Sequence, residues 1–206
     1  MKRILLLLLF SLVVNLSHYT AWGQKGFEDS VIKVIKVYTK SIELNPKNDN
    51  AYLKRGYCKY LLEDSKLYRK VSIGAIEDYN KAIKINPKND TAYNIRGHYK
   101  FMVNNDSGAI KDYNKAIELN PYYVEAYNNR GLYYYSSLKN NERAIEDFSK
   151  AIELDTKNED AYYWRGYAKF FLGGYIGAAG GAYSDWQRAV ELGCTSCKEL
   201  IEKNCK

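Results

Sequence analysis

Histidine, proline and long apolar runs are the scarce features of this 206-residue chain. Only two histidines occur, His18 and His98, which argues against a metal site built from histidine side chains. The three prolines exclude collagen-like and proline-rich low-complexity proteins. No block of five or six like charges exists, whereas nucleic-acid binding needs clustered basic residues. We therefore predict no nucleic-acid partner, no metal and no other cofactor.

The longest apolar run lies near the N-terminus, between Ile4 and Val14, and a membrane-spanning helix needs about 20 such residues. Two basic residues precede the run and polar residues follow it, a pattern typical of a secretory signal peptide. We predict a signal peptide over residues 1–23, cleaved after Gly23, and no stable transmembrane anchor after cleavage. The protein would then be periplasmic or secreted. The alternative is an uncleaved N-terminal segment that anchors the protein to a membrane.

Internal repeats dominate the rest of the sequence, which is rich in tyrosine, with 21 residues. Four segments open with the same phrase, Ala-Tyr-x-x-Arg-Gly: Ala51–Gly56, Ala92–Gly97, Ala126–Gly131 and Ala161–Gly166. Each is followed by a second phrase with small and large apolar residues at helical spacing: Ala75–Ile83, Ala109–Ile117, Ala144–Ile152 and Ala182–Val190. The phrases predict two antiparallel helices per repeat, with small residues where the helices cross.

The spacing of the phrases supports a stacked repeat. A second phrase and the next opening phrase start 17 residues apart in every case, at 75 and 92, 109 and 126, and 144 and 161. The interval from each opening glycine to the second phrase varies, so insertions are confined to one kind of turn. Stacked repeats tolerate insertions on one edge in this way. We predict an all-α, right-handed helical solenoid of ten helices: one single helix, four pairs and one final helix.

The domain organisation follows from these boundaries. Each end of a stack needs a cap, because a repeat does not bury its apolar face alone. The predicted segments are a signal peptide (1–23), an N-terminal capping helix (24–47, helical from 27), four repeats (48–89, 90–123, 124–158 and 159–194) and a C-terminal capping helix (195–206).

The 34-residue unit that starts at Ala92 closely resembles the tetratricopeptide repeat (TPR), and the resemblance covers about residues 30–193. The chain departs from the pattern at Thr156 and Cys194, which replace the terminal proline, and in an enlarged turn around Leu62–Ser72. The resemblance implies a non-enzymatic scaffold or adaptor that binds a protein or peptide segment on the concave surface.

An arginine column recurs together with an aspartate column. Four arginines and four aspartates are simplest to pair within each repeat, where two parallel hydrogen bonds per pair would tie the helices together as a structural strut. The functional alternative is that the arginines form a ladder that binds anions. The four predicted pairs are Arg55 with Asp78, Arg96 with Asp112, Arg130 with Asp147, and Arg165 with Asp185.

The concave surface of such a solenoid is lined by the first helix of each repeat, and helical spacing assigns a candidate ligand-binding groove there. Its amides suit an extended peptide backbone, and its rings suit peptide side chains. The alternative is that many of these rings pack between helices. The candidate groove residues are Tyr57, Asn94, His98, Phe101, Asn128, Asn129, Leu132, Tyr135, Tyr163, Trp164 and Tyr167. No nucleophile or carboxylate is spaced to work with His98, and we predict that the protein is not an enzyme.

The even number of cysteines suits an exported protein with disulfides. A link between Cys194 and Cys197 is the first choice, with free thiols and pairing to another chain as alternatives. The five glycines within 173–181 predict either a mobile, partner-contacting loop or a simple spacer. Two other functions stay open: binding of a glycan or envelope polymer through the aromatic residues, and thiol redox chemistry at the Cys-x-x-Cys motif.

Overall fold

The computed structural model of the chain describes residues 21–62, 73–177 and 179–204. Within these residues it contains ten helices and no strand, so the predicted all-α architecture is confirmed. The enlarged turn predicted around Leu62–Ser72 falls mostly outside the described residues. The helices are α2 (Ala21–Leu44), α3 (Asp49–Leu61), α4 (Ile73–Ile85), α5 (Asp90–Met102), α6 (Asp106–Leu119), α7 (Val124–Ser136), α8 (Asn141–Leu154), α9 (Glu159–Gly177), α10 (Ala179–Leu192) and α11 (Ser196–Asn204).

The chain divides into two compact units, Met1–Asp78 and Tyr79–Lys206, with the boundary inside α4. In the first unit α2 packs against α3, around the buried side chains of Val31, Cys58 and Leu62. The helix α2 begins six residues before its predicted start, so residues 21–23 of the predicted signal peptide belong to it. The rest of that segment, residues 1–20, lies outside the described part of the chain.

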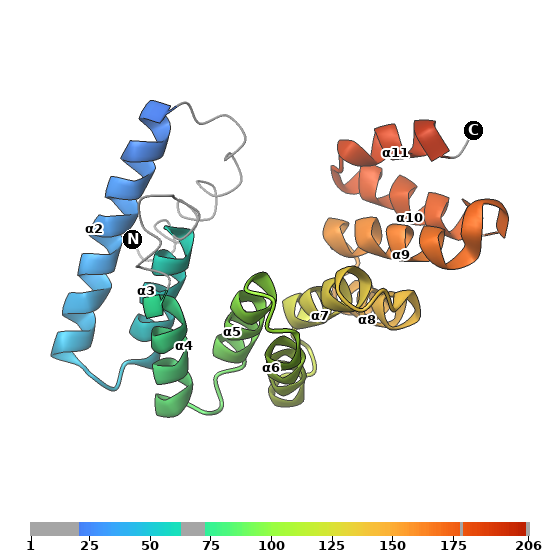
Figure 1. Cartoon of the computed structure of the whole chain (residues 1–206). Helices are drawn as coiled ribbons and strands as arrows, with labels where there is room; N and C mark the ends of the chain where they lie inside the picture. The colour runs from blue at the N-terminus through green and yellow to red at the C-terminus, as the bar shows by residue number, and fades with distance from the viewer. Residues whose placement is uncertain (1–20, 63–72, 178, 205–206) are drawn as a thin grey trace. The chain divides into compact units, whose positions relative to one another are not determined.

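The second unit consists of successive helix pairs and a final single helix (Figure 1). The pairs are α5 with α6, α7 with α8 and α9 with α10, and α11 packs on α10. We call the first helix of each repeat its A helix (α3, α5, α7 and α9) and the second its B helix (α4, α6, α8 and α10). The A helices also contact one another, α5 with α7 and α7 with α9, so that they share a face. We call the surface formed by the neighbouring helices α5, α7 and α9 the A-helix face of the second unit.

The turns that lead into the four A helices share one pattern of hydrogen bonds. Each starts with a side-chain oxygen that accepts a hydrogen bond from the backbone N–H two residues later, at Asn45, Asn86, Asn120 and Asp155. In three of them an asparagine then caps the A helix by accepting from the N–H three residues later, at Asn48, Asn89 and Asn158. This repeated hydrogen bonding explains the constant 17-residue spacing. Because Asp155 makes the same turn, the following Thr156 can replace proline.

The glycine column makes room for aromatic rings. A Cβ atom added to Gly131 would lie 2.9 Å from the ring of Phe148, and one added to Gly97 would lie 2.9 Å from the ring of Tyr113. Both rings are fully buried. The same Cβ on Gly97 would lie 3.3 Å from the carbonyl oxygen of Ala109, as expected where the helices cross, but the ring four residues after that alanine comes closer.

The glycine-rich segment within 173–181 is helical on both sides of residue 178, at the end of α9 and the start of α10. The prediction of a loop there was wrong. A glycine inside a helix costs only about 1 kcal/mol relative to alanine, and the long contact between α9 and α10 offsets this cost.

Candidate functional site

The four arginines of the repeats bind the four aspartates within their own repeats, as the count of columns predicts. In each pair Nε donates to Oδ2 at 2.8–2.9 Å and Nη2 donates to Oδ1 at 2.6–2.7 Å. Such paired bonds fix the guanidinium in one plane. The aspartates are all buried. The pairs are Arg55–Asp78, Arg96–Asp112, Arg130–Asp147 and Arg165–Asp185.

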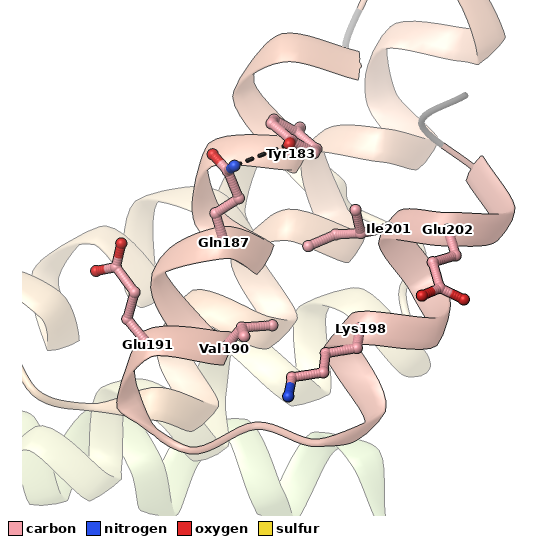
Figure 2. A pocket seen from close by; sticks show the side chains of 7 residues that line it. All are labelled: Tyr183, Gln187, Val190, Glu191, Lys198, Ile201 and Glu202. Atoms are coloured by element: carbon pink, nitrogen blue, oxygen red, sulfur yellow. Dashed lines mark hydrogen bonds between the residues drawn. The ribbon is translucent and has the colours of Figure 1, made fainter.

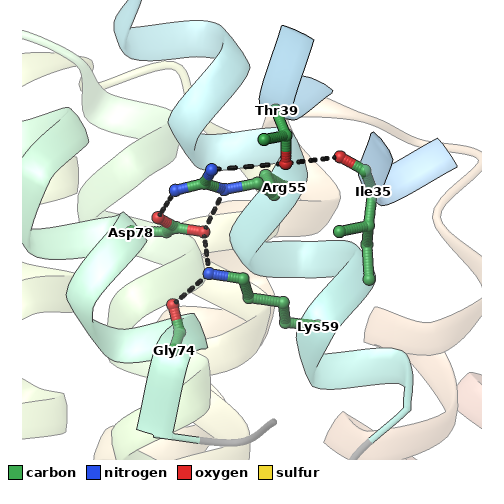
Figure 3. A network of polar contacts seen from close by, with 6 residues as sticks. All are labelled: Ile35, Thr39, Arg55, Lys59, Gly74 and Asp78. Carbon is green, nitrogen blue, oxygen red and sulfur yellow. Dashed lines mark hydrogen bonds and ion pairs between the residues drawn. The ribbon is translucent and has the colours of Figure 1, made fainter. Parts of the chain in front are cut away.

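Each arginine also reaches the helix before its own repeat, a contact that the sequence analysis missed. Its Nη1 donates to a side-chain oxygen located 16 residues earlier: Thr39 at 3.4 Å, Asn80 and Asn114 at 2.7 Å, and Ser149 at 3.1 Å. Figure 3 shows the first of these networks, in which the guanidinium of Arg55 lies between Thr39 and Asp78. The sequence signal was present, because a hydrogen-bonding side chain stands 16 residues before every arginine.

Two further groups complete these networks. The tyrosine three residues before each arginine places its ring 5.5–5.7 Å from the guanidinium carbon. In three repeats a lysine forms a second ion pair with the aspartate at 2.7–2.8 Å: Lys59, Lys100 and Lys169. With their donors occupied by aspartate, neighbouring oxygens and rings, the arginines work as struts between helices.

The third repeat differs, because Tyr134 occupies the position of the lysine. Arg130 is thus the one cation that forms an ion pair with Asp147 among the described residues. Burial raises the pKa of Asp147, and the nearby Arg130 opposes that rise. Arg143 also lowers this pKa from a distance, but the described residues show no ion pair between Arg143 and Asp147.

The candidate groove residues of α5 and α7 form a polar network. The Asn94 side chain is buried, donates to the hydroxyl of Tyr123 at 3.3 Å and accepts from Asn129 at 3.0 Å. The expectation of an open amide at Asn94 is therefore corrected, since its side chain links α5 to α7. The Oδ1 atom of Asn128 is shielded from solvent and has no hydrogen-bond partner among the described residues. Tyr123 was not predicted, because it replaces the capping asparagine of the other turns.

The other groove residues of α5 and α7 lie partly buried. The rings of His98 and Phe101 are tilted against each other, with centroids 6.4 Å apart, and burial lowers the pKa of His98. Phe101 and Leu132 pack against the core around Tyr133. Tyr57 belongs to the first unit, where its side chain is 38% exposed beside Tyr60.

An aromatic cluster covers the A-helix face from α7 to α9. The Tyr135 ring lies 5.7 Å from Trp164, 6.4 Å from Tyr167 and 6.3 Å from Phe171. Tyr163 contacts both Trp164 and Tyr167 at 5.0 Å. Burial raises the pKa of Tyr167. Phe171, which was not predicted, is 59% exposed, so the cluster opens to solvent at this ring.

The disulfide cysteines belong to the buried cluster around Trp186, against which Tyr163 and Tyr167 also pack. Cys194 and Cys197 form a disulfide whose residues are both buried. They pack with Trp186 and with Leu200 and Ile201 of α11. Burial raises the pKa of the free Cys58 thiol to about 11.

A shallow groove between α10 and α11 was not predicted from the sequence (Figure 2). Within it the side-chain amide of Gln187 donates to the Tyr183 hydroxyl at 2.8 Å. The described residues contain no group of three or more His, Cys, Asp or Glu that could hold a metal ion. No helix in the described ranges is long and apolar enough to cross a membrane. The groove is lined by Tyr183, Gln187, Val190, Glu191, Lys198, Ile201 and Glu202.

The fold is an all-α helical repeat in which each arginine strut ties a helix pair to the helix before it. A family model described as TPR repeat matches residues 104–137 and 135–173. No curated protein sequence shows significant similarity to the chain. Over these residues and in its all-α fold, the chain is similar to TPR-repeat proteins.

Solved structures of TPR proteins resemble the chain over most of its length. The crystal structure of MamA is 26% identical, covers 90% of this chain and 99% of its own, and gives a TM-score of 0.64. YrrB, described as a TPR protein with an unusual peptide-binding site, is 18% identical, with coverages of 85% and 84% and a TM-score of 0.62. The first TPR of Spaghetti (RPAP3), solved with the HSP90 peptide SRMEEVD, is 25% identical over 56% of this chain and 92% of its own, with a TM-score of 0.52.

Proposed function

We propose that this protein is a non-enzymatic adaptor that binds an extended segment of a partner protein on the A-helix face of α5, α7 and α9. The observation that carries the proposal is the aromatic cluster of Tyr135, Trp164, Tyr167 and Phe171, which opens to solvent at Phe171. Aromatic side chains on a surface supply large contact area with few rotatable bonds and dominate many binding interfaces.

An acceptor that is unpaired among the described residues lies on α7, the helix that also carries Tyr135, and supports a peptide ligand. The shielded Oδ1 atom of Asn128 has no partner in the described structure, and a buried acceptor without a donor costs about 1–3 kcal/mol. A backbone N–H of a bound segment would supply the missing donor. The TPR of Spaghetti (RPAP3), which was solved with a bound peptide, supports peptide binding by this fold but not a particular peptide sequence.

The arrangement of the rings favours a peptide over a glycan. Tyr135 and Tyr163 meet Trp164 at interplanar angles of 51° and 82°, so these rings form no common flat platform for a sugar ring. Tyr167 with Phe171 is the parallel pair of the cluster, at 12°. Redox chemistry at Cys194 and Cys197 is disfavoured as well, because a thiol-exchange site requires an accessible sulfur and both residues are buried.

The second part of the proposal is that the protein is exported from the cytoplasm. It is supported by the apolar run after two basic residues and by the disulfide between Cys194 and Cys197, which suits an oxidising compartment. N-terminal sequencing of the protein from its native cells tests it. A mature chain that begins at Gln24 is expected, and retention of residues 1–23 on the membrane-bound protein would establish the anchored alternative.

Peptide binding is tested by selecting a phage-displayed library of random dodecapeptides on the purified protein. Selected sequences should bind the protein in fluorescence anisotropy, and Phe171→Ala should weaken that binding at least about tenfold, as expected for a central aromatic contact. Tyr122→Ala is the matched control, because this ring is 78% exposed but lies in the turn between α6 and α7. Failure to select any peptide, or equal losses in the two variants, would contradict the proposal.

A further inference from the structure

Every basic residue on the A helices of the second unit is already engaged. The helices α5, α7 and α9 carry five basic side chains. All five bind the buried aspartates of their own repeats at 2.6–2.9 Å, through the struts described above. The residues are Arg96, Lys100, Arg130, Arg165 and Lys169. The net charge of +7 of the whole chain is therefore not available as free basic side chains on these three helices.

Acidic side chains, in contrast, are exposed on the same face. Glu125 of α7 and Asp160 of α9 are both exposed. Glu125 precedes Asn129 by four residues and Leu132 by seven, so the three residues lie on one stripe of α7. Asp160 stands at the same spacing before Trp164 and Tyr167 of α9. The face thus joins carboxylates near the start of its helices to aromatic rings near their ends.

We infer that the partner segment held on the A-helix face is cationic and aromatic, with a lysine or arginine about five residues from a large apolar side chain. This inference rests on the proposed function. Ten residues of helix separate Glu125 from Tyr135, which is about 15 Å along the axis. An extended chain covers that distance with about five residues.

Charge complementarity also sets which ligands the face rejects. A bound carboxylate would need a free arginine or lysine, and the struts leave none on α5, α7 and α9. Exposed carboxylates at Glu125 and Asp160 would repel it, whereas they attract a cationic side chain. The rings of Tyr135, Trp164 and Phe171 provide in addition faces that attract lysine and arginine. An acidic, carboxylate-ended peptide is therefore disfavoured.

The same library selection tests the inference with a different readout. The selected dodecapeptides should be enriched in lysine or arginine about five positions from an aromatic or large aliphatic residue. A capped peptide of that composition should bind roughly tenfold more tightly than its matched copy with glutamate in place of the basic residue, and the difference should shrink at 1 M salt.

Charge reversal on the protein gives the decisive control. Glu125→Lys with Asp160→Lys should weaken the capped basic peptide roughly tenfold. Glu142→Lys with Glu146→Lys makes the same change of net charge on α8 and should leave binding within twofold. Selection of acidic peptides whose binding is lost in Phe171→Ala would overturn the inference and leave the proposed function intact. Equal effects of the two double reversals would also overturn it, and failure to select any peptide would overturn both.

Discussion

The third arginine strut offers the sharpest test of how the repeats hold together. Arg130→Ala removes the one cation that forms an ion pair with the buried Asp147 in the described structure, because Tyr134 stands where the other repeats have a lysine. Arg96→Ala is the matched comparison, since Lys100 still contacts Asp112 at 2.7 Å. The two substitutions delete the same side chain but leave different charges behind.

The expected losses of stability in the two variants follow from how deeply the ion pairs are buried. The Arg130 and Asp147 side chains are only 20% and 7% exposed, and removing one partner of a buried pair costs roughly 3–5 kcal/mol. In Arg96→Ala the retained Lys100 limits the loss to the hydrogen bonds, about 1–2 kcal/mol. At roughly 2–4 °C per kcal/mol for a chain of this size, the expected drops in Tm are about 12 °C for Arg130→Ala and about 4 °C for Arg96→Ala.

Thermal unfolding followed by circular dichroism at pH 7 measures both values. Adding Asp147→Asn to Arg130→Ala should restore part of the lost stability, because a neutral amide needs no cation. Equal drops in Tm for the two single variants, or no recovery in the double variant, would refute the assignment of Arg130 as the main partner of the Asp147 charge.

The same strut predicts a pH dependence. Burial raises the pKa of Asp147 in the folded protein, so the folded state takes up a proton more readily than the unfolded state does. Loss of Arg130 raises this pKa further, and the destabilisation is then largest above it. The gap in Tm between Arg130→Ala and the unmodified protein should therefore narrow as the pH falls from 7 toward the ordinary carboxyl value near 4. A constant gap would show that the buried charge is not the cause.

Three further changes probe other parts of the fold by thermal unfolding. Gly131→Ala places a Cβ 2.9 Å from the ring of Phe148, and overpacking of this kind should cost about 1–3 kcal/mol; unchanged stability would show that the ring moves freely. Asn89→Ala removes the side-chain cap of α5 and should cost about 1 kcal/mol, whereas Asn89→Asp should be nearly neutral. Reduction of the Cys194–Cys197 disulfide opens a very short loop and should cost about 2 kcal/mol, seen as a small drop in Tm; complete unfolding on reduction would contradict this local role.

The repeat could be predicted from the sequence because its determinants are local. The constant 17-residue spacing reflects turns whose hydrogen bonds all lie within a few residues, as at Asn86 and Asn89. The arginine and aspartate columns recur at fixed positions within their own repeats, so counting them was enough to pair Arg130 with Asp147. A repeat whose units contact only their neighbours makes such local patterns sufficient to predict the fold.

Part of the candidate site depended on contacts between helices that no spacing reveals. The sequence does not show that Asn94 is buried between α5 and α7, because its burial depends on Tyr123, which lies 29 residues away. Nor does it show that the rings around Tyr167 pack together and leave Phe171 exposed, since this depends on how α7 lies against α9.

The sequence by itself determined the helix pairs and the partner of each strut, since both depend on residues within one repeat. Tertiary structure alone decided the third contact of each arginine, the helical course of the glycine-rich segment and the charge of the A-helix face. The reason is that the sequence does not show whether a side chain binds a neighbouring helix or stays exposed to solvent, where a ligand can reach it. Only the packed structure shows that all five basic residues of α5, α7 and α9 are committed, while Glu125 and Asp160 stay exposed.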